Sequence, residues 1–128
     1  MILYDFDYER PDSLEQASAD LRRLGKGARL AAGGTALYPS MRVENDCPTT
    51  VVSVGALMPT APVRQPDGSI RIDALMRLAA LERDELIRDA LPMLAEAAGV
   101  VAGAQIRHMA TLGGNLCQDT RCLYLNQK

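Results

Sequence analysis

The chain has 128 residues, of which 48% are hydrophobic and 23% charged, a composition that is typical of one folded domain or two small subdomains and excludes a disordered chain. A formal net charge of −2 argues against a nucleic-acid partner, because neutralising phosphates requires a basic surface. The acidic N-terminus and the lack of an apolar run of ~18 residues argue against a signal peptide and a membrane span, so we expect a cytoplasmic protein.

The N-terminal part of the chain predicts a strand followed by a helix. Residues 2–6 can begin an edge strand, and residues 11–24 carry apolar side chains at helical spacing. Asp12 or Ser13 can cap this helix, with an acid or amide three residues later to reciprocate. Gly25 follows where a left-handed C-terminal residue is wanted.

The next segments continue the alternation of strands and helices. Residues 28–33 predict a short buried strand that leads into a glycine pair, and residues 35–42 predict a short helix interrupted at Pro39. Residues 49–57 are rich in β-branched side chains and predict another strand.

The second half predicts a hairpin and then helices. Residues 61–75 form the expected hairpin, because Asp67 and Gly68 can supply the positive φ values of a two-residue turn. Asp73 should cap a helix that extends through Leu81. A further helix begins near Pro92, and its apolar stripe is expected in the core: Leu91, Leu94, Ala95, Ala98 and Val101.

This order of elements predicts two units. Residues 1–57 would form a small α/β subdomain, and residues 58–128 would form the start of a second, α+β subdomain. The join is expected near residues 56–62.

Two glycine pairs carry the strongest functional signal: Gly33-Gly34 in "AAGGTALYPS" and Gly113-Gly114 in "ATLGGNLC". Without a Cβ, backbone N–H groups can point outwards, and a following helix N-terminus favours an anion such as phosphate. Neither pair fits the common phosphate-loop or dinucleotide patterns, and each alone is compatible with plain turn chemistry. Together they predict one ligand with two phosphates held between them.

The segments "AAGGTALYPSMR" and "QIRHMATLGGNLCQDTRC" resemble the FAD-binding subunit of the molybdenum hydroxylases, the xanthine and carbon monoxide dehydrogenase family. Within that family, "GGNLCQDTRC" followed by "YLNQ" is most similar to the flavin subunit of 4-hydroxybenzoyl-CoA reductase. The resemblance implies an α+β fold, the FAD-binding domain of the molybdopterin dehydrogenase or vanillyl-alcohol-oxidase-like type. It also implies two small subdomains with the second truncated, because family members continue well beyond residue 128.

The resemblance implies that the two glycine motifs clasp the pyrophosphate of FAD, with Leu37 beside the flavin. The residues carried over as cofactor-binding are Ala32, Gly33, Gly34, Thr35, Ala36, Leu37, Thr111, Gly113, Gly114 and Asn115. Three positions depart from the family pattern, namely Ala36, Asp73 and Met76. Asp73 matters most, because a carboxylate near a pyrophosphate would repel it unless the side chain turns away to cap a helix.

The odd number of cysteines favours free thiols or metal ligation over a disulfide framework. The resemblance implies that Cys122 is a ligand of an iron–sulfur cluster, and only in a complete subunit whose downstream cysteines supply the missing ligands. Cys117 and Cys122 alone match no strong metal pattern. Cys47, next to Pro48, is interpreted as a structural or incidental thiol.

Four other side chains keep two interpretations each. His108 can be hydrogen-bonded within the structure or contact the ligand, and Arg107 and Arg42 can reach phosphate or lie in solvent. Tyr38 can stack near a flavin or cover the core. The sequence does not decide among these roles.

Two functions follow from the sequence. In the first, the chain is the FAD-binding part of an electron-transfer subunit that works with an iron–sulfur subunit and a molybdenum-cofactor subunit. In the second, it is a cofactor-free assembly module, favoured by the departures at Ala36, Asp73 and Met76. We expect the isolated chain to be inactive, to bind FAD weakly or not at all, and to self-associate.

Overall fold

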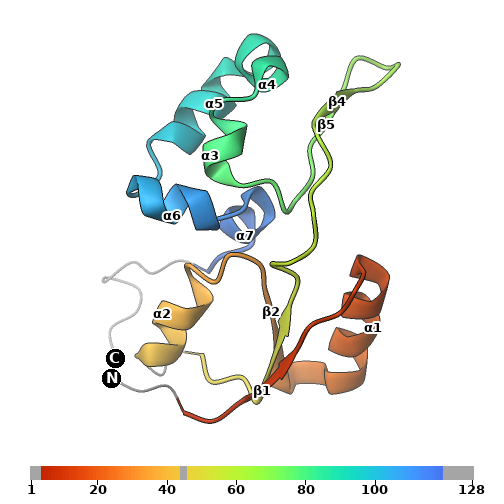
Figure 1. The fold of residues 1–128 in the computed structure, drawn as a ribbon, viewed down its shortest axis with the longest axis vertical. Helices are drawn as coiled ribbons and strands as arrows, with labels where there is room; N and C mark the ends of the chain where they lie inside the picture. Colours follow the sequence, from red (N-terminus) through yellow and green to blue (C-terminus); the bar gives the residue numbers. More distant parts are fainter. Residues whose placement is uncertain (1–3, 44–45, 120–128) are drawn as a thin grey trace.

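A computed structural model describes residues 4–43 and 46–119 of the chain. Figure 1 shows two parts: residues 4–57 form the lower part around a small sheet, and residues 63–116 form the upper part from a hairpin and short helices. Three hydrophobic clusters fill the interior, and none has buried members from both parts. The predicted boundary near residue 57 stays a prediction.

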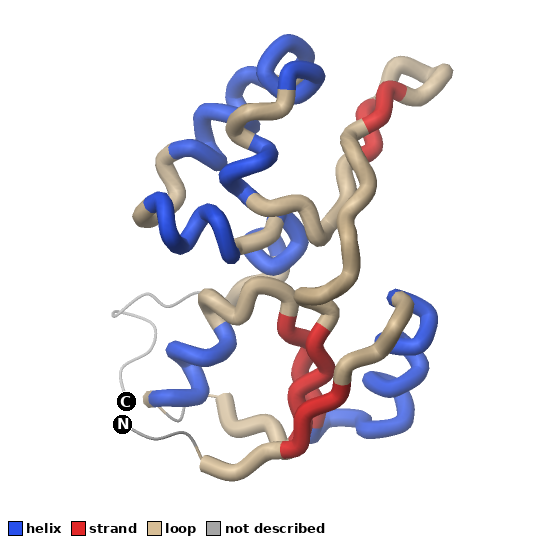
Figure 2. The backbone as a smooth tube through the Cα atoms, viewed as in Figure 1, coloured by secondary structure: helices blue, strands red, loops and turns tan. Residues whose placement is uncertain are grey.

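The lower part is a parallel sheet covered on both faces by helices, as Figure 2 shows in outline. The sheet has the order β1-β3-β2, so β3 is central. The elements are β1 (Asp7–Glu9), α1 (Leu14–Leu24), β2 (Ala28–Ala31), α2 (Leu37–Arg42) and β3 (Thr50–Ser53), and the single turn η1 (Gly25–Gly27) joins α1 to β2. This is the predicted order of strands and helices.

Alternation along β3 explains the two covered faces. Val51 packs with Ala31 and Met41 on the α2 side, whereas Val52 packs with Ala17 on the α1 side. Every residue of β3 is buried, as expected for a strand between two helical layers. Because β1 and β2 both pair parallel with this buried strand, the segments after β1, β2 and β3 leave the sheet at the same edge.

The signals predicted for α1 are confirmed. Ser13 Oγ accepts a hydrogen bond from the Gln16 amide at 3.1 Å, and Gln16 Oε1 accepts one from the Asp12 amide at 3.0 Å. At the other end Gly25 has φ of 66°, the left-handed value that favours glycine there.

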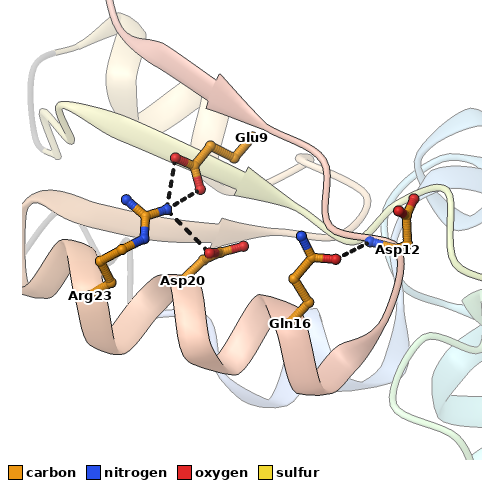
Figure 3. A network of polar contacts seen from close by, with 5 residues as sticks. All are labelled: Glu9, Asp12, Gln16, Asp20 and Arg23. Carbon is orange, nitrogen blue, oxygen red and sulfur yellow. Dashed lines mark hydrogen bonds and ion pairs between the residues drawn. The ribbon is translucent and has the colours of Figure 1, made fainter.

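An ion-pair network joins α1 to β1. Figure 3 shows Arg23 Nη2 between the carboxylates of Glu9, at 2.9 Å, and Asp20, at 3.1 Å. The Arg23 side chain is more than half exposed, so solvent screens the pair and it contributes little to folding. Its main structural effect is that the Glu9 carboxylate is engaged on the α1 side of the sheet.

Two strand predictions need correction. The first strand begins at Asp7 rather than within 2–6, because the rings of Tyr4 and Phe6 pack into the cluster beneath α2; residues 1–3 lie outside the described residues. The strand predicted at 28–33 is β2, and its middle residues Arg29 and Leu30 are exposed because β2 is at an edge of the sheet. β1 is at an edge, as expected.

The upper part is an antiparallel hairpin beside five short helices. Its elements are β4 (Val63–Arg64), β5 (Ile70–Arg71), α3 (Leu78–Leu81), α4 (Glu85–Ala90), α5 (Pro92–Gly99), α6 (Ala104–Met109) and α7 (Leu112–Leu116). Pro92 is the first residue of α5, as predicted. Ala95 and Ala98 of the predicted stripe are buried, whereas Leu91 is 38% exposed because it lies in the break between α4 and α5.

Two predictions for this part are wrong in detail. The hairpin turn is longer than two residues: the Gln65 amide donates to the Ser69 carbonyl at 2.7 Å, and only Gly68 of the predicted pair has positive φ, at 85°. The helix expected to start at Asp73 begins instead at Leu78. Asp73 is used in the preceding turn, as described below.

The two halves of the upper part are joined by a short antiparallel contact before α3 and α7. Arg77 and Thr111 are opposite one another, with the Leu78 amide donating to the Ala110 carbonyl at 3.0 Å and the Leu112 amide to the Met76 carbonyl at 2.9 Å. This contact places the second glycine pair beside the segment that leads from the hairpin. Among the described residues, none of the helices has the length and apolarity needed to cross a membrane.

Candidate functional site

A cleft of about 390 Å³ lies where the strands of the parallel sheet end. Its walls come from the carboxyl ends of β1, β2 and β3 and from the start of the upper part; the lining residues are Tyr8, Arg10, Ala32, Gly33, Tyr38, Ser53, Gly55, Ala56, Arg77 and Met109. Ligands of open α/β sheets bind at this edge, where the turns after the strands meet. The volume is within the usual range of roughly 300–1,000 Å³ for small-molecule sites.

The charge of the cleft favours an anion. Arg10 and Arg77 line it, and its lining contains no aspartate or glutamate. Burial raises the pKa of Tyr38, and the adjacent Tyr8 raises it further, so the Tyr38 hydroxyl is neutral at physiological pH. The cleft is therefore positively charged in a chain whose formal net charge is −2.

A second cavity, of about 380 Å³, is at the opposite ends of the strands. Asp5 and Asp7 line it without any lysine or arginine, together with Tyr4, Phe6, Cys47, Pro48 and Thr49. Two carboxylates make this cavity unsuitable for phosphate. The cleft at the carboxyl ends is the better anion site.

The turn after β2 borders the cleft at Ala32 and Gly33 and contains unpaired backbone donors. In the described part of the chain, none of the N–H groups of Gly33, Gly34, Thr35 and Ala36 donates a hydrogen bond to another residue. The Gly34 carbonyl, by contrast, accepts from the Tyr38 amide at 3.1 Å. A run of free N–H groups beside two guanidinium groups is the arrangement that binds phosphate.

Packing of the protein itself explains why this turn contains glycine. A Cβ at Gly33 would clash with the carbonyl oxygen of Met109, and a Cβ at Gly34 would clash with the ring of Tyr38. Gly34 also has φ of 70°, which other residues rarely adopt. We expected these glycines to make room for the ligand; in the structure they first make room for α6 and for Tyr38.

The second glycine pair lies in a helix rather than in a turn. Thr111, 2% exposed, is the N-cap of α7, and its Oγ1 accepts from the Gly114 amide at 3.1 Å. The Gly113 amide donates to the Ala74 carbonyl at 2.8 Å, and the Asn115 amide to the Thr111 carbonyl at 2.9 Å. A Cβ at Gly113 would lie only 2.8 Å from the Cβ of Ala74.

The two motifs meet despite their separation in the sequence. Gly33 contacts the Met109–Ala110 backbone, directly before Thr111, so both pairs lie at the junction of the lower and upper parts. Ala32 and Gly33 line the cleft itself, and Thr111, Gly113, Gly114 and Asn115 do not belong to its lining. Leu37 packs in the cluster of Ala31, Met41 and Val51 beneath α2.

Comparison with known proteins identifies the family. The family described as "FAD binding domain in molybdopterin dehydrogenase" matches residues 4–122. The chain belongs to this family.

Relatives of known activity agree with this assignment. The chain is 33% identical over 112 residues to caffeine dehydrogenase subunit beta of Pseudomonas sp. strain CBB1, and 38% identical over 111 residues to 6-hydroxypseudooxynicotine dehydrogenase complex subunit alpha of Paenarthrobacter nicotinovorans. These matches cover 88% and 87% of this chain, and 38% of each relative. The chain thus spans about two fifths of the relatives it matches.

A solved structure shows the same fold. The reconstituted CO dehydrogenase from Oligotropha carboxidovorans superposes with a TM-score of 0.82 and 35% sequence identity, over 90% of this chain and 40% of that chain. The expected α+β fold of the FAD-binding domain is therefore confirmed over the part of that structure that this chain covers.

All three departures from the family pattern, Ala36, Asp73 and Met76, lie outside the cleft lining, and Ala36 is the last residue of the open turn. Asp73 accepts hydrogen bonds from the Thr60 amide at 3.0 Å and from the Leu75 amide at 2.9 Å. The amide of Thr60 in particular holds the pKa of Asp73 below its ordinary value. Met76 is 7% exposed and packs in the upper core. The expected repulsion between Asp73 and a bound phosphate therefore loses its structural basis.

Arg10 and Arg77 are the site residues that the sequence did not reveal. Arg77 directly precedes α3, and its guanidinium donates to the carbonyl of Met109 and, at 3.2 Å, to the carbonyl of Gly55. Arg10 follows β1. No motif surrounds either residue, so only their position at the carboxyl edge of the sheet could have indicated a role.

The other candidates are placed away from the cleft. Arg107 pairs with Glu82 at 3.5 Å and donates to the Val101 and Ala102 carbonyls, so it supports the loop before α6. Arg42 is exposed in the last turn of α2, and His108 is exposed on α6. Tyr38 covers the core beneath α2 and also lines the cleft, and its stacking on a flavin stays a prediction.

The cysteines form no metal site within the described residues. Cys47 and Cys117 are exposed free thiols, and no group of three or more histidine, cysteine, aspartate or glutamate side chains in this part of the chain could hold a metal. Cys122, the expected cluster ligand, lies outside the described residues.

Proposed function

We propose that the chain is the FAD-binding part of the electron-transfer subunit of a molybdenum-containing hydroxylase or dehydrogenase, and that the cleft holds the FAD pyrophosphate. One observation carries the proposal: the Gly33–Ala36 turn, whose amides have no acceptor in the described part of the chain, begins at Gly33 in the lining of the cleft that Arg10 and Arg77 also line. This donor set fits a diphosphate, which offers only acceptor oxygens and negative charge.

The residues have separate roles in this proposal. The amides of Gly33, Gly34 and Thr35 bind phosphate oxygens, with Ala32 and Ala36 at the ends of the turn. Leu37 and Tyr38 support the turn from below. When bound, FAD accepts and passes on electrons singly or in pairs, and the protein supplies its position and electrostatic environment.

The second glycine motif contributes mainly by packing within the protein rather than by binding phosphate through its amides. Because the amides of Gly113, Gly114 and Asn115 already donate within the chain, its contacts to the ligand would come from side chains such as that of Asn115. The Asn115 side-chain oxygen accepts from Gln118 Nε2 at a long 3.4 Å, which leaves its amide group available to a ligand. Thr111 holds α7 in place from its N-cap position.

The partners and substrate of the parent enzyme follow the same proposal. An iron–sulfur subunit and a molybdenum-cofactor subunit would exchange electrons with this one, in the cytoplasm. We propose 4-hydroxybenzoyl-CoA reductase as the parent enzyme, on the basis of the resemblance of the segment "GGNLCQDTRC". Most of the cluster-binding segment, including Cys122, falls outside the described residues, and a cluster would need cysteines that this chain does not contain.

The alternative, a cofactor-free assembly module, has less support than the FAD-binding proposal. Its three arguments concern Ala36, Asp73 and Met76, and all three residues lie outside the cleft lining. Self-association of the chain stays a prediction, which light scattering at high protein concentration would test: a strictly monomeric species would contradict it.

Titration of the purified chain with FAD tests the proposal. Neutral hydrogen bonds contribute only ~0.5–1.5 kcal/mol each, and binding costs at least ~4 kcal/mol in lost ligand freedom. We therefore expect quenching of flavin fluorescence with a Kd on the order of micromolar or weaker, relieved by excess ADP. Purification with stoichiometric flavin would contradict the weak affinity, and no quenching at millimolar FAD would contradict the function.

A further inference from the structure

The two arginines of the cleft differ in how they are held, and this difference assigns them separate tasks. The guanidinium of Arg77 is fixed by two carbonyl acceptors, Met109 from the end of α6 and Gly55 from the turn after β3. Its backbone is held by the contact with Thr111. Arg77 thus connects the lower and upper parts across the wall of the cleft.

The carbonyls that Arg77 binds would otherwise oppose an anion. A carbonyl oxygen carries partial negative charge, and the Met109 carbonyl also lies against Gly33, the first open amide of the turn. By donating to this carbonyl, the guanidinium offsets its negative potential at the cleft. A guanidinium presents its N–H donors in a planar fork, so one Arg77 side chain can hold both carbonyls at once.

Arg10 is held differently. It follows β1, is exposed, and has no hydrogen bond or ion pair within the described part of the chain. The neighbouring carboxylate, Glu9, is bound by Arg23 on the α1 side of the sheet. Because Glu9 is bound by Arg23, it does not neutralise the charge of Arg10 at the cleft.

We propose that Arg10 and Arg77 make the cleft specific for a doubly charged diphosphate group, Arg10 as a direct contact and Arg77 as a positioning residue that acts through the Met109 and Gly55 carbonyls. The proposal rests on the proposed function for the identity of the ligand as FAD. Its own claim is the recognition of the diphosphate, whichever nucleotide carries it.

The test measures the affinities of the full chain for inorganic pyrophosphate, ADP and FAD by calorimetry over a series of KCl concentrations. The variants are Arg10→Gln, Arg77→Gln and Arg77→Lys, and Arg64→Gln on β4, outside the cleft lining, is the matched control. Adenosine, which lacks phosphate, is the control ligand. Salt screens interactions between exposed charges, so the salt dependence of the affinity reports the charges involved.

Arg10→Gln should lower the affinity for all three phosphate ligands about tenfold and reduce its salt dependence, as loss of one charge-assisted contact predicts. Arg77→Gln should have a similar effect. Arg77→Lys should keep the salt dependence and still lose affinity, because an ammonium group cannot bridge both carbonyls. If Arg77 had a purely structural role, Arg77→Gln and Arg77→Lys would both lower the stability of the fold, and their ligand affinities would have the same salt dependence.

Each outcome decides something. If Arg10→Gln binds pyrophosphate with the affinity and salt dependence of the parent, as Arg64→Gln should, the proposal is overturned and FAD binding stands on its own titration. If the parent binds pyrophosphate and ADP but not FAD, the diphosphate site stands and the proposed function fails. If the parent binds none of these ligands, both fail.

Discussion

The two glycine pairs share a sequence signature, a threonine with two adjacent glycines, yet the structure uses them differently. Gly33 and Gly34 are in an open turn whose amides have no acceptor in the described part of the chain. Gly113 and Gly114 are in α7, and their amides donate to Ala74 and Thr111. The comparison shows that amide availability, rather than the presence of glycine, distinguishes a phosphate-binding turn from a packing contact.

Gly33→Ala should have the largest effect, because its Cβ would clash with the Met109 carbonyl, a backbone atom that can move only with α6. We expect a loss of ~2–4 kcal/mol in the free energy of unfolding, measured with urea. Gly103→Ala is the control: its Cβ would meet only Gln105 Oε1 at 3.5 Å, an ordinary contact. Equal stability of the two variants would show that the first pair does not hold the two parts together.

Gly113→Ala should be the next most damaging change. Its Cβ would lie 2.8 Å from the Cβ of Ala74 and 3.0 Å from its carbonyl oxygen, so the turn at Ala74 must shift. We expect ~1–3 kcal/mol of destabilisation by urea titration. Gly114→Ala should cost less, since its nearest atom is the Oγ1 of Thr111, at 2.8 Å, on a side chain that can rotate. The reverse order would break the assignment of Gly113 as the packing residue.

Thr111→Val tests the cap of α7. Valine keeps the shape but cannot accept from the Gly114 amide, so we expect a loss of ~1 kcal/mol, with Thr111→Ser recovering most of it. Thermal unfolding of the three proteins is the measurement. If valine were as stable as threonine, the hydroxyl would be dispensable and the Gly114 amide would be free for a ligand, which would make the two pairs alike.

Local signals in the sequence predict some elements well. The cap of α1 at Ser13, its end at Gly25 and the start of α5 at Pro92 each depend on neighbouring residues only. The helix at Gly113-Gly114 was missed because glycine is a poor helix former, and the contacts that stabilise it come from the buried Thr111 cap, from Ala74 and from packing of Leu112 on the upper core.

Features that depend on distant contacts were beyond the sequence. Arg10 follows β1 and Arg77 precedes α3, and both residues line one cleft because the fold brings these two segments together. The role of Asp73 was also inaccessible, because its partner Thr60 precedes the hairpin. The motif residues at Ala32–Gly34 were found because the family resemblance marks them, and their free amides became visible only in the structure.

Asp73→Asn should have the smallest effect, with a characteristic pH dependence. Asp73 fixes the turn before Ala74, which supports the second glycine pair, and hydrogen bonds from the Thr60 and Leu75 amides lower its pKa from 3.8. A depressed pKa means that the carboxylate stabilises the fold above the unfolded value and that this contribution is lost as pH falls through the folded pKa. Urea midpoints should differ slightly at pH 7, and the difference should shrink as pH falls below about 3.8 and vanish below the lower, folded pKa. A stability difference between the parent and Asp73→Asn that persists at low pH would contradict the claim that the ionised carboxylate stabilises the fold.

The central claim, that the first pair binds the diphosphate while the second pair packs the protein, is tested most directly by amide NMR of the labelled chain during titration with FAD. The account predicts that the amide signals of Gly33, Gly34 and Thr35 shift most, because their N–H groups gain acceptors, whereas those of Gly113 and Gly114 keep their present partners and shift little. Large shifts at Gly113 and Gly114 with the first turn unchanged would contradict it.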